Sequence, residues 1–582
     1  MLSNSVAAAA LATAYVIALV LHLNPTLPLH PLRFAPLVAT VGLYYVVHLT
    51  VIFYVLLVIR QLLAREVFSP AWISVDVLAW LSAIAAGAGA VLVWRNLVAF
   101  SLVLDVATAA ALLASTIILS ATAALCLLVA LLRRRMPEAR AVWAPLFVLV
   151  VVSSVASLLT LRGRGVPLLL ETRPIDVSFG PARADRTGRV TVIAIDGGSL
   201  DLVIGATAEG KLPNFGRMLD AGAARRLATL HPTSAEAVWA AVATGKLPQK
   251  NGVRSSAIYQ LAGGGGAMQL LPDYCFAHGL ERFGFIVEQA HTSATLRART
   301  LWSILSTEGF TVGVVGWPLT QPAPVVRGYI VGDTYHRTAL TASGIDNPSG
   351  IYPPNLQLDA QSALETASRE ASPVSMASMG GAGITTIDSR QETPARTDRI
   401  YEGIASAMSR VRPAQVTLTR YQSLDPIGHY FLRYAQPADF GDVTDEERRR
   451  LGTVLERHYN LIDEAIGRAM ASMGPDDLLV VVSGYGMEPL GLGKRLIERA
   501  IGDPDLSGTH ETGPDGFLLA YGASVLRGRQ QGRASVVDVT PTILYFLGLP
   551  LGRDMDGNAK TDLFERSFTD ERPITFIPTY DR

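Results

Sequence analysis

The sequence is poor in cysteine and has no excess of charge of either sign. Its 582 residues include two cysteines, Cys126 and Cys275, and 50 basic residues balance 50 acidic ones. Because Cys126 falls in an apolar stretch, no disulfide can form within the C-terminal part of the chain, which excludes a small disulfide-stapled fold. The even charge balance argues against a surface for nucleic-acid polymers. A chain of this length indicates more than one domain.

Charged residues are also scarce in the first 165 residues, which contain five long apolar stretches. They cover residues 5–24, 36–62, 72–94, 106–132 and 141–160. Each reaches about 20 residues, the length that crosses a bilayer as a helix. The first stretch lacks the basic start of a cleavable signal peptide, and more stretches follow it. Buried helices of a large soluble core are the alternative, but five such stretches in one block favour an all-α transmembrane bundle over residues 1–165.

Arginines between these stretches predict how the bundle is oriented. The loops after the second and fourth stretches carry Arg60, Arg65, Arg133, Arg134, Arg135 and Arg140. The loops on the other side carry Arg33 and Arg95. Short loops rich in arginine stay in the cytoplasm. We therefore expect an integral protein of the cytoplasmic (inner) membrane, with its N-terminus inside and its C-terminal domain extracytoplasmic, or periplasmic.

The remaining sequence predicts an α/β domain over residues 188–582, joined to the bundle by a linker at 166–187. Short apolar runs alternate with helical stretches, as is typical of a doubly wound, mostly parallel sheet with helices on both faces. The clearest strands are Val190–Ile195, Thr311–Val315, Gln415–Thr419, Leu478–Val482 and Phe517–Tyr521. The clearest helices are Leu212–Ala221, Ala235–Ala243, Thr300–Glu308, Glu447–Met473 and Val537–Leu547. Residues 263–266 and 372–398 are rich in small residues and are expected to be flexible loops or an insertion.

Residues that can bind a metal follow several of these strands. Asp196 directly follows the first strand, and Asp425 and His429 follow another after a short loop, four apart in what reads as a tight turn. Ligands in open α/β sheets bind beyond the carboxyl ends of the strands, so these residues are expected to share a site. With His510 they offer Asp, His and His, a sound set for zinc with one open position. A lone histidine is more often structural, and Asp196 has helix capping as its alternative role.

A hydroxyl nucleophile is the other candidate. Thr233 and Glu236 precede an apolar helix with the spacing of a capping box. A hydroxyl at a helix N-terminus also lies where backbone amides favour a phosphate, and it would form a phospho-enzyme intermediate there. Both roles can hold together. We favour Thr233 over its neighbour Ser234 as the nucleophile.

Together these segments resemble the type I phosphodiesterase/nucleotide pyrophosphatase branch of the alkaline phosphatase superfamily. The matching segments, in order, are Val192–Gly197, Leu212–Met218, Ala240–Gly245, Thr300–Leu305, Val315–Pro318, Leu424–His429, Gly508–His510, Val537–Pro541 and Asp554–Gly557. The resemblance extends over most of residues 188–560 and implies an alkaline-phosphatase-like fold with a two-metal centre. It also implies that Asp425, His429 and His510 hold one of the metals.

The second metal site that the resemblance implies is altered in this chain. In the family, that metal is held by the residue matching Asp196, by the nucleophile and by an Asp–His pair, and this pair is replaced here by Gly484 and Tyr485. The chain therefore keeps one site for a divalent metal, for which zinc is the expected ion, and the second site is doubtful. Tyr485, Lys246 or a metal recruited by Asp196 and Glu488 would have to help activate the nucleophile.

These observations lead to two main hypotheses. The first is a membrane-anchored, metal-dependent phosphoester hydrolase or phosphotransferase that acts at the outer face of the membrane on a lipid- or nucleotide-linked phosphodiester. Lipid-modifying phosphotransferases share this layout of spans followed by an outer domain, which is an argument by analogy. The second is a catalytically degenerate binding or regulatory module, because of Gly484 and Tyr485. A transporter role is less favoured, since the spans lack paired charges. The expected partners are the lipid bilayer and a phosphorylated small molecule or lipid, and the oligomeric state stays open.

Overall fold

The computed structural model describes residues 1–27, 29–64, 73–135, 140–165, 179–181, 188–264, 266–273, 276–277, 279–337, 350–371, 386–528 and 532–581. Arg65, Cys275 and all of the predicted linker 166–187 except residues 179–181 lie outside this description. The chain forms two compact units. Unit 1 consists of Met1–Glu171 and Arg254–Ala290, and unit 2 of Thr172–Val253 and His291–Arg582.

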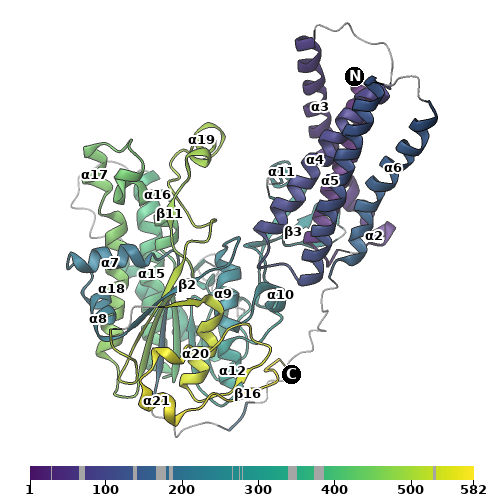
Figure 1. Cartoon of the computed structure of the whole chain (residues 1–582). Coiled ribbons are helices and arrows are strands. Elements are labelled where there is room, and N and C mark those ends of the chain that lie inside the picture. Colours follow the sequence, from purple (N-terminus) through teal and green to yellow (C-terminus); the bar gives the residue numbers. More distant parts are fainter. Residues whose placement is uncertain are drawn as a thin grey trace. The chain divides into compact units, whose positions relative to one another are not determined.

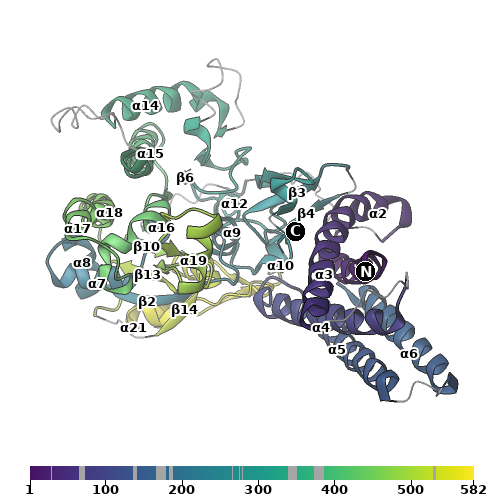
Figure 2. The same ribbon diagram turned by 90° about the horizontal axis from the view of Figure 1, so that it is seen from above.

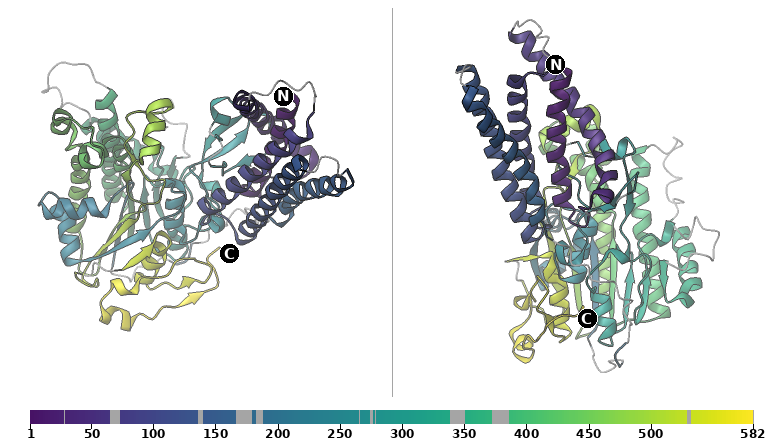
Figure 3. Two further views of the ribbon diagram at one scale, coloured as in Figure 1. Left: turned by 45° about the horizontal axis from the view of Figure 1, so that its top comes forward. Right: turned by 90° about the vertical axis from the view of Figure 1, so that its right-hand side faces the viewer.

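Unit 1 contains the predicted apolar helices. They are α1 (Leu2–Leu23), α2 (Pro31–Leu37), α3 (Leu43–Ala64), α4 (Val75–Ala99), α5 (Val106–Arg135) and α6 (Arg140–Leu159). Within the described residues, five helical stretches are long and apolar enough to cross a membrane, and they correspond to the five predicted stretches. The second of these runs from α2 into α3 without a break. Figure 3 shows the N-terminal helices, coloured purple to blue, running side by side.

A short antiparallel sheet from the middle of the chain also belongs to unit 1. It comprises β3 (Ala257–Leu261), β4 (Ala267–Met268) and β5 (Ile286–Ala290), and Figure 2 shows β3 and β4 beside α2 and α3. Tyr259 and Met268 pack against Val16 and Tyr44 in one apolar cluster. The predicted domain 188–582 therefore differs from the observed unit, because the apolar face of this sheet is buried by the N-terminal helices.

Two asparagines of the bundle fix this segment through its backbone. The Asn24 amide donates to the Leu270 carbonyl (2.7 Å) and accepts from the Leu270 N–H (3.0 Å). Asn96 makes the same pair of hydrogen bonds with Asp273, at 3.1 and 2.8 Å. Buried amide side chains thus satisfy backbone groups that no strand partner reaches.

Unit 2 is an α/β fold around a nine-stranded sheet. The strand order is β14-β2-β13-β10-β1-β9-β6-β7-β8. The strands are β1 (Val190–Ile195), β2 (Ala223–Ala228), β6 (Val312–Val315), β7 (Gly328–Val331), β8 (Ile351–Tyr352), β9 (Val416–Tyr421), β10 (Leu478–Ser483), β13 (Gly516–Tyr521) and β14 (Arg533–Ser535). The five strands from β10 to β7 pair in parallel, while β13 and β8 run antiparallel to their neighbours. The predicted mostly parallel sheet is confirmed.

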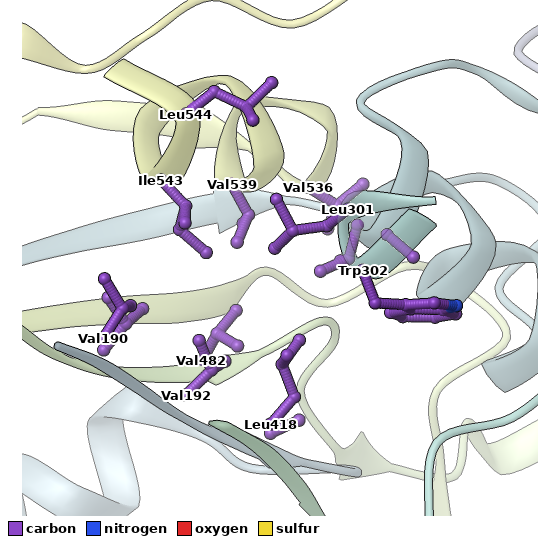
Figure 4. Close-up of a cluster of buried hydrophobic side chains, with 14 of the residues drawn as sticks. Val190, Val192, Leu301, Trp302, Leu418, Val482, Val536, Val539, Ile543 and Leu544 are labelled. Carbon is purple, nitrogen blue, oxygen red and sulfur yellow. The ribbon is translucent and has the colours of Figure 1, made fainter. Parts of the chain in front are cut away.

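Helices cover both faces of this sheet (Figure 1). One face packs against α9 (Ala235–Thr244), α12 (Leu301–Thr307) and α20 (Val539–Phe546). The other packs against α7 (Leu200–Ala208), α8 (Pro213–Ala221), α16 (Leu424–Ala435) and α18 (Val454–Ala471). Alternate side chains of β1 enter the two cores: Val190 and Val192 the first, shown in Figure 4, and Ile193 the second. This two-sided burial explains why β1 reads as a continuous apolar run.

One predicted loop is partly helical. Of the stretch 372–398, residues 372–385 lie outside the described part of the chain, but α15 (Thr386–Val411) begins at Thr386. Ile400, Ile404 and Met408 on this helix pack in a cluster with Val315 and Val331 of the sheet. Burial of this apolar stripe stabilises the helix despite its Ser- and Thr-rich start and Pro394.

Candidate metal site and its surroundings

The carboxyl ends of three adjacent strands bring the predicted site segments together. Ile195 of β1 pairs with Ser483 of β10 on one side and with Tyr421 of β9 on the other. Asp196 continues this register, with its N–H donating to the Tyr421 carbonyl at 3.0 Å. The chain then leaves β9 and enters α16, which carries Asp425. The expectation that these segments share one edge of the sheet is confirmed by the strand order.

Asp425, His429 and His510 form the one group of possible metal ligands found among the described residues. Asp425 and His429 lie one turn apart on α16, rather than in the tight turn expected from the sequence. His510 follows β12 (Gly508–Thr509), the short strand that pairs with β11 (Glu488–Pro489). One ligand atom from each residue lies within 4.8 Å of the others. The nearest pair, His510 Nε2 and Asp425 Oδ1, is 3.4 Å apart.

Hydrogen bonds at this cluster leave ligand atoms available. His429 Nδ1 lies 2.9 Å from the Gly508 carbonyl, which favours Nδ1–H as the donor and leaves Nε2 as an electron-pair donor. Asp425 Oδ1 and His510 Nδ1 are buried without a hydrogen-bond partner. Burial lowers the pKa of His510 and outweighs the opposite effect of Asp425, which favours the neutral imidazole that binds metals. The donor types, their spacing and these unsatisfied atoms fit a divalent cation with an open position.

Three glycines allow the ligand-bearing segments to approach closely. A Cβ on Gly508 would lie 2.3 Å from the Gly428 carbonyl oxygen, and a Cβ on Gly428 would lie 2.8 Å from Met487. Gly197 has φ +67°, and a Cβ there would lie 2.9 Å from Asp425 Cα. The backbone contacts between α16, β12 and the turn after β1 therefore depend on missing side chains.

Asp196 forms an ion pair with an arginine of the neighbouring strand. Its side chain is buried, and Arg420 of β9 donates hydrogen bonds to both carboxylate oxygens. Nε lies 3.0 Å from Oδ1, and Nη2 donates to Oδ2. The indole N–H of Trp239 donates to Oδ1 at 2.6 Å. Burial raises the pKa of Asp196, and Arg420 opposes that rise. These contacts differ from the role as a metal ligand that was expected for Asp196.

At Gly484 and Tyr485, the two positions that depart from the family pattern, neighbouring side chains pack closely. A Cβ at Gly484 would lie 2.4 Å from a methyl carbon of Val238, so a side chain there would require Val238 to move. Tyr485 is 0% exposed, and its ring centroid lies 4.9 Å from that of His510. Its hydroxyl is buried without a hydrogen-bond partner. Burial raises the pKa of Tyr485, and Asp196 and Asp425 raise it further.

The two candidate nucleophiles differ in their surroundings. Thr233 is 5% exposed and donates its hydroxyl proton to the Leu230 carbonyl at 2.8 Å. Ser234, which is half-buried, is the N-cap of α9, and its Oγ accepts the Ala237 N–H at 3.4 Å. The predicted capping box of Thr233 and Glu236 is therefore wrong, because the helix begins one residue later than that pattern requires.

Of the auxiliary residues, Lys246 is engaged elsewhere. It is 3% exposed, and its Nζ lies 2.5 Å from a carboxylate oxygen of both Asp554 and Asp581. This double ion pair lies beyond the C-terminal end of α9, whereas the candidate nucleophiles lie at the N-terminal end. These contacts differ from the role in activating a nucleophile that was expected for Lys246. Glu488 lies on β11 opposite Thr509, which precedes the candidate ligand His510 in the sequence.

Sequence reasoning missed three residues that shape this edge. Arg420 is a charged residue near the end of an otherwise mostly uncharged strand, which was an available signal. Trp239 lies in an apolar helix, and nothing in the sequence indicated a role for it at this site. Asp398 of α15 accepts the N–H groups of Gln422 (2.8 Å) and Ser423 (3.0 Å), which holds the segment leading into α16. Burial raises the pKa of Asp398 to about 7.

The fold and the site thus define an α/β domain with a candidate metal-ligand set beyond the carboxyl ends of its strands. A model of the type I phosphodiesterase/nucleotide pyrophosphatase family matches residues 190–537, and the chain belongs to this family of the alkaline phosphatase superfamily.

Solved structures were also compared with the chain. Murine ectonucleotide pyrophosphatase/phosphodiesterase 5, as an inactive variant in complex with AMP, is similar at 12% identity and a TM-score of 0.37. The human protein of the same name is similar at 11% identity and a TM-score of 0.36. Each comparison covers 65% of this chain and 100% of the other. No curated protein sequence matches the chain.

Proposed function

We propose that this protein is a membrane-anchored phosphoester hydrolase or phosphotransferase that uses one divalent metal, with zinc as the expected ion. The observation that carries the proposal is the cluster of Asp425, His429 and His510, whose ligand atoms converge and include a carboxylate oxygen without a hydrogen bond. Family membership supports the reaction class. The apolar helices of unit 1 support the membrane anchor.

In this proposal the chain's own residues bind and orient the substrate. The three ligands would hold the cation, which when bound polarises a phosphoryl oxygen. The first turn of α9 presents backbone N–H groups, which favour a phosphate at that position. Thr233 is the proposed nucleophile and Ser234 the alternative. We expect the substrate to be a lipid- or nucleotide-linked phosphodiester at the outer face of the membrane.

The test uses the full-length protein in detergent, loaded with zinc, with bis(p-nitrophenyl) phosphate as the substrate. Asp425→Asn and His510→Ala should lose both the bound metal and turnover. His30→Ala, which replaces an exposed histidine of unit 1, is the matched control and should lose neither. Turnover that persists in His510→Ala without bound metal would refute metal-dependent chemistry at this cluster.

A second function is favoured by the Asp196–Arg420 pair and the filled space at Gly484. These features suit a module that binds a phosphorylated ligand without turnover. Metal bound by the wild type, with inorganic phosphate binding but no hydrolysis of any diester or monoester tested, would support that alternative.

A further inference from the structure

The place of a second metal lacks the ligands that such a metal needs. A Cβ at position 484 would lie 2.4 Å from a methyl carbon of Val238, and the fully buried Tyr485 replaces the imidazole that the family places next to it. Asp196, which would be the remaining ligand, already binds a guanidinium and an indole N–H. The residues present therefore do not fit a second metal ion.

The Arg420 guanidinium occupies a strongly acidic and buried environment. Its side chain is 10% exposed, and Asp196, with which it makes a two-point ion pair, is 3% exposed. Burial alone would lower the pKa of Arg420, but Asp196 and, to a lesser extent, Tyr485 and Asp333 raise it. Against the larger effect of burial, the charge of Arg420 lowers the pKa of Glu236. The fixed cation thus binds both oxygens of the Asp196 carboxylate, at the place where a bound metal would neutralise it.

We infer that Arg420 is a built-in replacement for the second metal ion, so that this protein has one exchangeable metal and one covalently fixed positive charge. The inference rests on the proposed function and defines the charge of its site. A guanidinium remains ionised at every accessible pH and matches a carboxylate with two parallel hydrogen bonds. Because the charge is already in place, no metal has to be recruited to neutralise Asp196. Arg420 is a positioning residue, since it acts through Asp196.

This replacement makes a prediction about metal stoichiometry. Removing the guanidinium leaves a buried carboxylate with the Trp239 N–H but without a cation, which is strongly unfavourable, so the site should take up a cation instead. Isothermal titration of metal-stripped, full-length protein with Zn²⁺ should give one site in the wild type and two in Arg420→Ala. The added site should disappear in the double variant Arg420→Ala/Asp196→Asn, and Arg420→Lys should not gain it.

The control is a buried arginine on another strand of the same sheet. Arg225 of β2 is 1% exposed and pairs with Asp562 at 2.9 Å. Arg225→Ala should bind the same number of zinc ions as the wild type, because Asp562 is half-exposed and keeps its hydration. A gain of zinc in Arg225→Ala as well would overturn the inference, since any lost arginine would then have that effect.

Several outcomes separate this inference from the proposed function. Wild type that already binds two zinc ions, one of which is lost in Asp196→Asn, overturns the inference and leaves the proposed function standing. Wild type that binds none refutes the proposed function; a zinc site gained in Arg420→Ala would then still support the replacement of a metal by Arg420, and the absence of a gain would overturn it. An Arg420→Ala variant that folds but gains no site also overturns it.

Chemical rescue of turnover provides a second readout that a purely structural role would not give. Arg420→Ala should lose about 10²–10³-fold in turnover, the range seen when one fixed electrostatic group is removed. Millimolar guanidinium chloride should restore part of this loss, and tetramethylammonium chloride at equal ionic strength should not. Equal effects of the two salts would count against a specific role of the guanidinium. If Arg420→Ala does not fold, the wild-type and Asp196→Asn titrations decide.

Discussion

Glu236 lies within the acidic surroundings of Arg420 and is expected to couple stability to pH. Burial, with smaller contributions from Asp196 and Asp333, raises its pKa from 4.5 to about 7, and Arg420 opposes this. Between these values the unfolded state loses a proton that the folded state keeps. The free energy of unfolding should therefore fall as the pH rises from about 4.5 to 7, by about 1–3 kcal/mol.

Glu236→Gln should remove this part of the pH dependence. Urea unfolding followed by tryptophan fluorescence, at about pH 5 and about pH 8, measures the difference in the free energy of unfolding. The control is Glu209→Gln, which replaces an exposed glutamate at the end of α7. A pH dependence in Glu236→Gln as steep as in the wild type would show that other groups cause it.

The unpartnered hydroxyl of Tyr485 should lower stability in the absence of a ligand. A buried polar group without a hydrogen bond costs about 1–3 kcal/mol, so Tyr485→Phe should raise the free energy of unfolding by about 1 kcal/mol. The same urea experiment measures it. If turnover falls while stability rises, the hydroxyl contacts the substrate. A fall in stability would mean that the hydroxyl has a partner in solution.

The two hydroxyls at the start of α9 should respond differently to removal. Thr233→Ala should abolish turnover, and Thr233→Ser, which keeps a hydroxyl, should retain much of it. Ser234→Ala should lose a helix cap worth about 1 kcal/mol and keep most of its turnover. Initial rates with the aryl diester, normalised to folded protein, compare the three. The reverse order would make Ser234 the nucleophile.

At the scale of the residue, the sequence predicts the chemistry of a group better than its partner. Asp425, His429 and His510 were recognisable because each offers a metal ligand near the end of a strand or loop. The partner of Asp196 was not, because Arg420 is 224 positions away and faces it only once β9 lies beside β1. Strand order is a property of the whole sheet, which the local sequence does not encode.

At the scale of the element, the close contact between α16 and β12 should determine metal affinity. The Ser507 N–H donates to the His429 carbonyl at 2.7 Å, next to the contact between Gly508 and Gly428. Gly508→Ala forces these segments apart, so it should cost about 1–3 kcal/mol in stability and weaken zinc binding. Zinc titration and urea unfolding measure the two effects. Gly491→Ala is the control because its Cβ meets nothing within 4 Å, and equal effects of both variants would contradict the argument.

The elements predicted best were those with a clear run of apolar residues. The central strands are buried on both faces, and their predicted bounds lie close to the observed ones. The segment from Asp425 to His429, which contains Pro426 and Gly428, differs from the predicted turn because it is helical. Both residues suit the helix that forms. Pro426 lies in the first turn of α16, where its missing N–H needs no partner. Gly428 gives room to Met487, a contact that only the folded structure shows.

At the scale of the whole molecule, the arginines predict which side of the membrane unit 2 occupies. Arg60 and Arg133 lie near the ends of α3 and α5, on the side expected to be cytoplasmic. Arg133 also pairs with Asp76 at the start of α4, 2.6 Å away. An alkaline phosphatase reporter fused after Arg582 should therefore be active, and a fluorescent reporter that folds only in the cytoplasm should be dark. The opposite pair of signals would reverse the topology.

The division of the chain into units predicts that unit 2 cannot be isolated simply by removing the apolar helices. A chain of residues 188–582 still contains residues 254–290, whose apolar side chains Tyr259, Met268 and Ile286 pack against the deleted helices. An exposed apolar sheet face promotes aggregation. This truncated chain should therefore elute as aggregates in size-exclusion chromatography, with less than one zinc per chain.

Removing the extra segment as well should restore a well-behaved unit 2. The Arg297 N–H donates to the Asn251 carbonyl at 2.8 Å, so the chain leaves and re-enters unit 2 at neighbouring points. A short Gly-Ser linker can therefore replace residues 254–290 without straining the fold. This variant of 188–582 should be monomeric and bind one zinc, because all three ligands lie in unit 2. A monomeric, zinc-binding 188–582 chain that keeps residues 254–290 would contradict the argument, since the sheet would then be stable without its helical cover.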